Sequence, residues 1–505
     1  MTIMIGVIQR GKLEKLMPDL LRLERNWVQV GEVPWSSENF KVDLPGKWKL
    51  SLYASYKKRI VGYAICSIEG HVGRLNKILV DQELRNKGIG TRLWNEMLKR
   101  CRQLGLNRLE FKSALDNPAA ISFYKKKGCL FSGRAMGCDG KVRNTNMYIL
   151  KAKNPISHSM PTIGDLDIKS VSELIGSSSI ATGNTVDKLS SVICSYTRRR
   201  AAIATSSCTS ALHLGLRTLG IGKGDEVILP SFLCYSVLSA VLQTGASPVL
   251  VDINENDFNI SYESTSACIT KQTKAIIVPH LFGTPVSNID NFTSLGIPVI
   301  EDCAQSLGAD HNEKKVGSFG TMSAFSFYAT KMIAGGVGGM LALDDESLIS
   351  KAKDLVMADK RETFGECYNT RMSDIQAALA LSQMQRIDLF VRRRRYIAEK
   401  YTQLFERGEV DFNIPNPAES IFYRYIIRHA LKDYFIRSVN ARGLGCAEPI
   451  YKPLHRYLGL ADSKFPNTSK AFGEAVSIPI YPGLSDEQVL ESAGIILNWR
   501  QEVRK

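Results

Sequence analysis

The 505-residue sequence lacks the long apolar runs that a membrane-spanning helix requires, because no stretch approaches roughly 18 consecutive apolar residues. Its start, MTIMIGVIQRGKLEK, lacks the basic region, apolar core and small-residue cleavage site of a secretory signal. The eleven cysteines are odd in number and never spaced as Cys-x-x-Cys, which argues against a disulfide framework and a zinc site. No helix-turn-helix or aromatic RNA-binding pattern is present. We therefore expect a cytoplasmic protein without membrane insertion, metal or nucleic acid.

Acidic residues are scarce in one part of the chain only. Residues 1–152 contain 28 Lys and Arg against 13 Asp and Glu, whereas the remainder contains 37 of each. Such a basic surface suits nucleic acid, but it equally suits a small molecule that is rich in phosphate. The length predicts two to four domains. A basic module joined to a neutral module is the simplest interpretation.

Residues 1–152 alternate between strand-like and helical patterns and predict an α/β domain. In the stretch GTRLWNEMLKRCRQLG, helical spacing places Leu93, Met97 and Cys101 on one face.

A second helix is expected to begin at Pro118 and to end at Gly128. Residues 153–165 contain Pro, Ser and Gly without periodicity and predict a linker.

Residues 166–390 contain short strands rich in Val and Ile, separated by helix-like stretches. Continuous apolar strands of this kind predict a mostly parallel sheet with helices on both faces. Residues 391–505 begin with long helices and predict a smaller α+β domain. The predicted strands are AAIATS, DEVILP, SPVLVDI, TKAIIVPH, IPVIEDCA and TMSAFSFY.

The stretch VDQELRNKGIG lies between a predicted strand and a predicted helix. Gly88 and Gly90 would let the backbone approach an anion closely, and the N–H groups of a helix start would cradle its oxygens. This pattern predicts a phosphate-binding loop.

The stretch NPAAISFYKKKG follows this loop in the sequence. Together they resemble the GNAT N-acetyltransferase superfamily over most of residues 1–152. The resemblance implies acetyl-CoA as acyl donor, with Asn117 positioning it and Tyr124 protonating the leaving thiolate. It also implies that the pyrophosphate is bound by Arg85, Lys87, Gly88, Ile89 and Gly90. The base that deprotonates the acceptor amine is left open between Glu69, His71 and Glu110.

A single lysine separates an aromatic run from a glycine cluster in SFYATKMIAGGVGG. Asp302 stands at the end of an earlier predicted strand, where open α/β sheets bind ligands. An Asp that faces a pyridine nitrogen and a Lys that forms a Schiff base are the pair that pyridoxal 5'-phosphate (PLP) requires. Thr209 and Ser210 lie at a strand-to-helix junction that suits a phosphate. Lys331 is therefore predicted to be a reactive amine rather than a surface lysine.

From about residue 160 onward, the chain resembles the DegT/StrS-type PLP-dependent sugar aminotransferases, which have the fold of type I PLP enzymes. The resemblance implies that Lys331 binds the cofactor covalently and shuttles a proton, and that Asp302 keeps the pyridine nitrogen protonated. Gln305 would lie by the ring and phenolic oxygen, and Tyr235 would stack on the ring. The matching stretches are CTSALHLGLRTLGIGKGDEVILPSF, VPHLFGTP, EDCAQSLGA, SAFSFYATK, YNTRMSDIQAAL, YKPLH and SIPIYPGLSDEQV.

The same resemblance implies that Thr209, Ser210 and Ser326 bind the cofactor phosphate. Asn369 would reach the phosphate of a neighbouring subunit, which implies a homodimer with shared active sites. The sequence departs from the family at Cys208, where a Gly is usual, and at Val337, where a Glu is usual.

Two sites of this kind in one chain predict a bifunctional enzyme of amino-sugar biosynthesis. An amino group, taken from glutamate, would be transferred to a nucleotide-linked keto-deoxysugar, and acetyl-CoA would then acylate the new amine. An alternative is a transaminase for a non-sugar carbonyl, as in aminocyclitol or amino-aromatic pathways, with an unrelated acceptor for the acetyltransferase. A third is a PLP- or CoA-sensing regulator, or a nucleic-acid-binding protein that uses its basic half.

Overall fold

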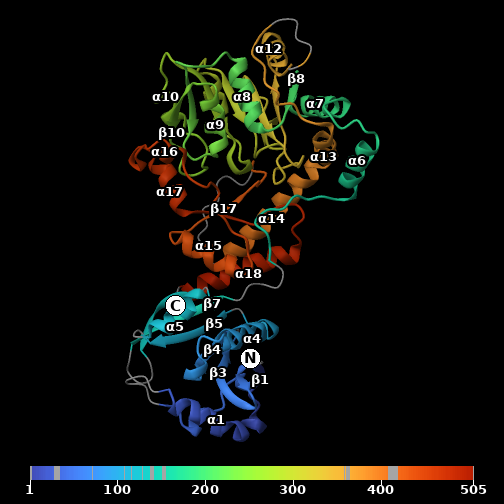
Figure 1. Cartoon of the computed structure of the whole chain (residues 1–505). Coiled ribbons are helices and arrows are strands. Elements are labelled where there is room, and N and C mark those ends of the chain that lie inside the picture. Colours follow the sequence, from blue (N-terminus) through green and yellow to red (C-terminus); the bar gives the residue numbers. More distant parts are fainter. Residues whose placement is uncertain are drawn as a thin grey trace. The chain divides into compact units, whose positions relative to one another are not determined.

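The computed structural model describes residues 3–27, 34–70, 72–106, 108–114, 117–127, 129–136, 142–149, 155–357, 359, 364–407 and 419–503. The chain forms two compact units, one that comprises Met1–Pro155 and Asn440–Gly443 and one that comprises Ile156–Val439 and Leu444–Lys505. Both are drawn in Figure 1, and each is described by itself. His71 and Gly128 lie outside the described residues. No disulfide joins the cysteines that the structure describes.

Among the described helices, none combines the length and the apolar character that crossing a bilayer requires.

The described strands of the first unit form one sheet in the order β1-β2-β3-β4-β5-β7-β6. Its strands are β1 (Met4–Val7), β2 (Leu52–Tyr56), β3 (Arg59–Glu69), β4 (Val72–Val80), β5 (Arg108–Ala114), β6 (Leu130–Met136) and β7 (Val142–Ile149). Its helices are η1 (Arg10–Lys12), α1 (Leu13–Arg25), α2 (Ser37–Lys41), α3 (Lys47–Leu50), η2 (Gln82–Leu84), α4 (Ile89–Gln103) and α5 (Pro118–Lys126). The predicted helices correspond to α4 and α5. On α4, Leu93, Met97 and Cys101 are all fully buried, as their spacing predicts.

A single parallel pair interrupts this antiparallel sheet. The pairing of β4 with β5 runs only from Val72 opposite Arg108 to Leu75 opposite Phe111. Both strands continue beyond these residues without pairing to each other, so the sheet opens there into a wedge. The loop after β4 therefore lies at the open end of this wedge.

The large sheet of the second unit has the order β10-β9-β11-β12-β15-β16-β8. Five neighbouring strands, from β10 to β15, are parallel, and β16 runs antiparallel between β15 and β8. The strands are β8 (Ala201–Thr205), β9 (Glu226–Pro230), β10 (Ser247–Val251), β11 (Thr273–Pro279), β12 (Val299–Asp302), β15 (Met322–Ser326) and β16 (Gly339–Leu343). A small hairpin joins β13 (Asp310–His311) to β14 (Lys314–Lys315). The predicted mostly parallel sheet is confirmed.

Helices cover both faces of this sheet. Because side chains on both faces are therefore buried, the strands consist of continuous runs of apolar residues. On β16, Leu341 and Leu343 join the core cluster with α8, α9 and α12, whereas Met340 and Ala342 join the cluster with α7 and α13. The helices are α6 (Asp165–Gly176), α7 (Asn184–Thr197), α8 (Cys208–Thr218), α9 (Tyr235–Gln243), α10 (Tyr262–Ala267), η3 (Leu281–Gly283), α11 (Ile289–Thr293), α12 (Glu346–Val356) and α13 (Asp374–Met384).

The C-terminal part of the second unit packs long helices around a two-stranded sheet, β17 (Tyr425–Arg428) with β18 (Ala475–Ile478). The helix α14 (Ile387–Arg407) runs through the domain boundary predicted at residues 390 and 391. The remaining helices are α15 (Lys432–Ala441), α16 (Leu454–Tyr457), η4 (Asp462–Lys464), α17 (Pro466–Glu474) and α18 (Asp486–Val503).

The predicted linker, residues 153–165, is described from Pro155 onward. Ile156 is buried and forms a parallel bridge with Leu444. The backbone oxygen of Thr162 accepts a bond of 2.9 Å from the Gln383 amide. From Ile156 onward this segment thus packs into the second unit.

Candidate active sites

The carboxyl ends of the parallel strands bring several predicted site residues to one edge of the large sheet. Asp302 ends β12 and pairs with Ala324 of β15, and Ser326 ends β15 opposite Gly339. Gly339 in turn pairs with Thr205, the last residue of β8. Asp302, Ser326 and the loop after β8 therefore face the same crevice, where open α/β sheets bind ligands.

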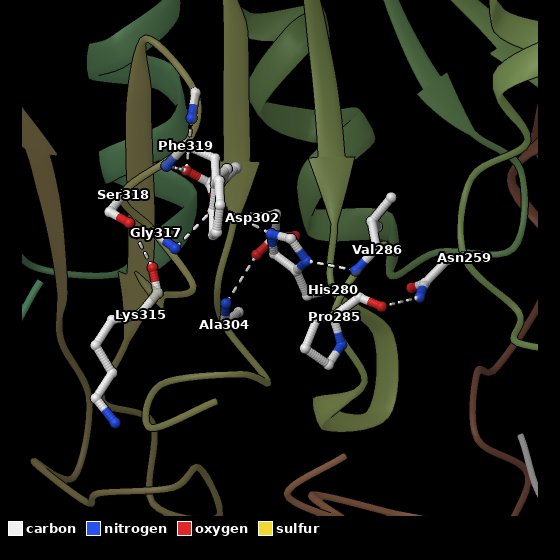
Figure 2. Close-up of polar contacts among 12 residues, drawn as sticks. Asn259, His280, Pro285, Val286, Asp302, Ala304, Lys315, Gly317, Ser318 and Phe319 are labelled. Atoms are coloured by element: carbon white, nitrogen blue, oxygen red, sulfur yellow. Dashed lines mark hydrogen bonds and ion pairs between the residues drawn. The ribbon is translucent and has the colours of Figure 1, made fainter. Parts of the chain in front are cut away.

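The carboxylate of Asp302 is buried and accepts few hydrogen bonds from the protein. Its Oδ1 accepts a bond of 3.0 Å from the Ala304 N–H (Figure 2), and no second protein donor to it is found among the described residues. Burial raises the pKa of this carboxyl above its usual range, which the Ala304 bond and the charge of Lys331 oppose. A protonated pyridine nitrogen would supply the missing donor and positive charge. The residue therefore fits the ring of PLP.

His280, Glu301 and Cys303 bring potential metal ligands together behind Asp302. The Val286 N–H donates to His280 Nδ1 at 3.0 Å (Figure 2). The proton of this ring is therefore on Nε2, which lies 3.1 Å from Glu301 Oε2. The His280 imidazole and the Glu301 carboxylate thus bond to each other and to nearby backbone N–H groups. Glu301 also accepts N–H bonds from Gly317, Phe319 and Gly320 at 2.7–2.8 Å.

The loop between β8 and α8 forms a cradle for an anion. Ser207 caps α8 by accepting a bond from the Ser210 N–H at 3.1 Å, and Thr209 lies in the first helical turn. A Cβ added to Gly339 would lie 2.3 Å from the backbone carbon of Ser207 and 2.4 Å from the nitrogen of Cys208. Only glycine lets the loop approach β16 this closely. The N–H groups of the first turn of α8 and the hydroxyls of this cradle fit the cofactor phosphate.

Lys331 lies in a tight loop between β15 and β16. Its N–H donates to the Tyr328 oxygen at 2.8 Å, and Gly336 and Gly338 hold the backbone at φ values of +79° and +140°. The Nζ atom lies 5.0 Å from the ring centroid of Tyr423. Among the described residues, none accepts a hydrogen bond from Nζ. The structure thus brings an unpaired amine and the Asp302 carboxylate to one crevice.

Gln305 and Cys208 complete the surroundings of this crevice. The Phe282 N–H donates to Gln305 Oε1 at 2.8 Å, so the amide nitrogen is directed away from Phe282 and can donate to a ligand oxygen. The charges of Asp302, Lys331 and Cys234 all influence the thiol of Cys208, although burial is the main cause of its raised pKa. Sequence reasoning noted Cys208 only as a departure and assigned no place to Cys234.

Asn369 and Tyr235 are both exposed to solvent. Thr370, next to Asn369, accepts a bond of 2.6 Å from the Ser206 N–H, which places Asn369 beside the phosphate cradle of its own chain. The ring of Tyr235 lies 4.8 Å from the ring of Tyr457. Their contacts with the cofactor stay predictions, as does the effect of Val337, which is half exposed.

In the first unit, the loop over residues 85–90 joins β4 to the start of α4. Gly88 caps the helix at a φ of +80°, which favours glycine. A Cβ on Gly90 would meet no protein atom closer than 3.8 Å, so the protein itself does not require glycine there. Ile89 is buried, whereas Arg85 and Lys87 are exposed beside the helix start. The open cradle and its two cations fit a pyrophosphate.

Tyr124 and Asn117 lie on α5. The Asn117 side chain caps this helix by accepting a bond of 3.0 Å from the Ala120 N–H. Tyr124 is buried, with its ring 4.2 Å from that of Phe111 on β5. Burial raises the pKa of its phenol above the usual range, so the hydroxyl stays protonated at neutral pH. This is the state that a proton donor needs.

The candidates for the acetyltransferase base do not gain support. Glu69 accepts a bond from Arg74, and Glu110 lies 2.7 Å from Arg108 and 3.5 Å from Arg74. Both carboxylates are thus engaged by arginine side chains rather than directed at an open site. His71 lies outside the described residues.

A buried ion pair between α1 and β4 was not predicted from the sequence. Glu24 Oε2 lies 2.8 Å from Lys77 Nζ, and Glu24 also accepts a bond from the Tyr63 hydroxyl. Lys77 lies 5.2 Å from the rings of Trp27 and Trp35. No local motif joins α1, β3 and β4, so only the folded chain shows this cluster.

Residues 161–495 match the DegT/DnrJ/EryC1/StrS aminotransferase family, and residues 19–129 match the acetyltransferase (GNAT) family. The spore coat polysaccharide biosynthesis protein SpsC of Bacillus subtilis is 30% identical over 68% of this chain and 96% of its own length. GDP-perosamine synthase of Vibrio cholerae is 30% identical over 67% of this chain and 97% of its own length. The aminotransferase TlmJ from Streptoalloteichus hindustanus superposes with a TM-score of 0.65 at 27% identity, over 69% of this chain and 100% of that structure.

Both family matches agree with the resemblances drawn from the sequence motifs. The chain therefore belongs to the DegT/DnrJ/EryC1/StrS aminotransferase family, and it is an enzyme in which a PLP-dependent aminotransferase follows an acetyl-CoA-dependent GNAT acetyltransferase.

Proposed function

We propose that this enzyme transfers an amino group from glutamate to a nucleotide-linked keto-deoxysugar and then acylates the new amine with acetyl-CoA. One observation carries the proposal: a single chain contains a domain that makes primary amines and a domain that consumes them. The names of the relatives support the sugar substrate, because they include GDP-perosamine synthases and a polysaccharide biosynthesis protein.

In the aminotransferase site, PLP supplies a carbonyl that captures amines and a ring that withdraws electrons from the substrate carbon. Asp302 would hold the proton on the pyridine nitrogen, and the Gln305 amide would donate to the phenolic oxygen. The start of α8, with Thr209 and Ser210, would bind the phosphate together with Ser326. Lys331 Nζ would carry a proton from the donor carbon to the cofactor and, in the second half-reaction, from the cofactor to the acceptor carbon.

In the acetyltransferase site, the N–H groups over residues 88–90 would bind the pyrophosphate of acetyl-CoA, and Arg85 would add positive charge. The acyl chain would enter the wedge between β4 and β5, next to Tyr124. The Tyr124 hydroxyl would give its proton to the departing thiolate.

The experiment that tests this proposal is mass spectrometry of the products from a panel of nucleotide keto-sugars. With glutamate alone, the wild-type enzyme should give the free amine, and with acetyl-CoA added it should give the amide. The Tyr124→Phe variant should accumulate the amine, with acylation slower by about 10² or more. The Lys331→Ala variant should form no amine but should acylate an amino sugar that is supplied.

The free amine without any amide from the wild-type enzyme would defeat the coupled reaction. Amination of carbonyl compounds that carry no nucleotide, with none on the sugar panel, would favour the non-sugar alternative.

A further inference from the structure

Tyr423 precedes β17 and is not among the residues that the family motifs assign. Only 4% of its surface is exposed, and it packs in the core cluster that includes Phe327 and Met332 on either side of the Lys331 loop. Its ring centroid lies 5.0 Å from Lys331 Nζ, within the range of a cation–π contact. Because Nζ has no hydrogen-bond acceptor among the described residues, this ring is the fixed group that the amine meets.

Two arginines contact Tyr423 from other directions. Arg424 Nη2 donates to the Tyr423 hydroxyl at 3.4 Å, with its guanidinium 4.7 Å from the ring centroid. Its Nη1 lies 3.4 Å from both ring nitrogens of His158. Arg394 is buried and donates to three backbone oxygens, among them that of Tyr423 at 3.2 Å. Both arginines are thus fixed by their other contacts.

The charges around the phenol are all positive. Burial alone would raise the pKa of Tyr423, but Lys331 and Arg424, helped by the Thr330 hydroxyl and by Arg394, lower it to about 8. Among the described residues, no carboxylate forms a hydrogen bond or an ion pair with this hydroxyl. The nearby carboxylate of Asp302 interacts electrostatically with Lys331 instead.

The charge of Lys331 changes during transamination, because its amine is alternately bound to the cofactor and free. A free, flexible lysine has about 2 kcal/mol of rotamer entropy and would not stay near the reacting carbon without a partner. The buried ring of Tyr423 can hold the free amine, and its hydroxyl can balance part of the positive charge.

We propose that Tyr423 is a positioning residue of the aminotransferase, whose ring holds the free Lys331 amine and whose hydroxyl tunes the charge that this amine carries. The inference depends on the PLP-dependent activity of the family and not on the sugar substrate.

The test compares the full-length, PLP-loaded enzyme with its Tyr423→Phe and Tyr423→Leu variants. Tyr425→Phe is the matched control, because this buried hydroxyl lies 3.0 Å from Thr402 and belongs to a different core cluster. The first readout is the pH titration of the visible absorbance of bound PLP, which needs no substrate. Loss of the hydroxyl leaves the arginine charges uncompensated, so both Tyr423 variants should lower the midpoint by about one pH unit.

The second readout is the single-turnover rate with glutamate. Tyr423→Phe keeps the ring and should retain most of the rate below pH 8, whereas Tyr423→Leu should lose about tenfold with little change in the glutamate concentration at half-maximal rate. If both Tyr423 variants titrate and react like Tyr425→Phe, the proposal is wrong. Should the Leu variant fail to fold, the unchanged midpoint of the Phe variant alone would overturn it.

Discussion

At the scale of single residues, the strictest steric demand in the aminotransferase site falls on Gly339. Three backbone atoms of Ser207 and Cys208 would lie 2.3–2.5 Å from a Cβ at this position. Gly339→Ala should therefore push the phosphate cradle away from β16 and destabilise the protein by roughly 1–3 kcal/mol. PLP retention on gel filtration should fall together with the melting temperature.

Gly494→Ala is the control for this substitution, because an added Cβ meets nothing within 4 Å in the middle of α18. It should leave both PLP retention and stability unchanged or slightly improved. Full PLP retention in Gly339→Ala would show that the cradle can move without losing the phosphate.

The candidate site residues that could be predicted from the sequence are those that stand in short local motifs. Lys331, Asp302 and Thr209 each follow or end a strand, and parallel topology brings strand ends together. Tyr423 could not be predicted in this way, because it comes from the C-terminal part of the second unit and meets Lys331 only in the folded chain. Tyr423 stands in an apolar stretch of the sequence, and such a stretch predicts only an ordinary core position.

At the scale of elements, the segment after Ile156 shows why a lack of periodicity is weak evidence for a linker. His158 lies 2.9 Å from Ser477 and faces Arg424, so the segment is tied to β18 and to the positive cluster at Tyr423. Such contacts depend on side chains more than 250 positions away. The partner of each strand cannot be predicted from its own sequence pattern either. The wedge between β4 and β5 forms because their pairing ends at Leu75 of β4.

The contacts of His158 predict that the stability of the protein depends on pH. Burial and the charge of Arg424 lower its pKa in the folded protein to about 3, whereas the unfolded chain takes up a proton near pH 6.5. Below pH 6.5 the unfolded state therefore binds more protons, and stability falls as the pH decreases. From pH 7 to pH 5 this group alone should remove about 2 kcal/mol from the free energy of unfolding.

Urea unfolding at both pH values checks this prediction. His158→Gln can still bond to Ser477 but does not titrate, so its free energy of unfolding should fall by about 2 kcal/mol less than that of the wild type. If the free energy of unfolding falls equally in the two proteins, His158 takes up a proton as readily in the folded state as in the unfolded state.

At the scale of the whole molecule, two chains are expected to share each aminotransferase site. The family resemblance assigns Asn369 to the partner's cofactor, whereas the bond between Thr370 and Ser206 places it beside the cradle of its own chain. Asn369 is exposed, and among the described residues it has no hydrogen-bond partner, so it is available to either site. A homodimer is the assembly that we expect.

Mixing two inactive variants distinguishes these alternatives. If Asn369 serves the partner, a dimer of one Lys331→Ala chain and one Asn369→Ala chain has one intact site, and random assembly should recover about a quarter of the wild-type transaminase activity. Lys331→Ala mixed with Asp302→Ala is the control, because both residues act within their own chain and no intact site can form. Recovery in the first mixture but not in the second would establish shared sites. If differently tagged chains purify together and neither mixture recovers activity, Asn369 completes the site of its own chain, and the dimer is not needed to bind the cofactor phosphate.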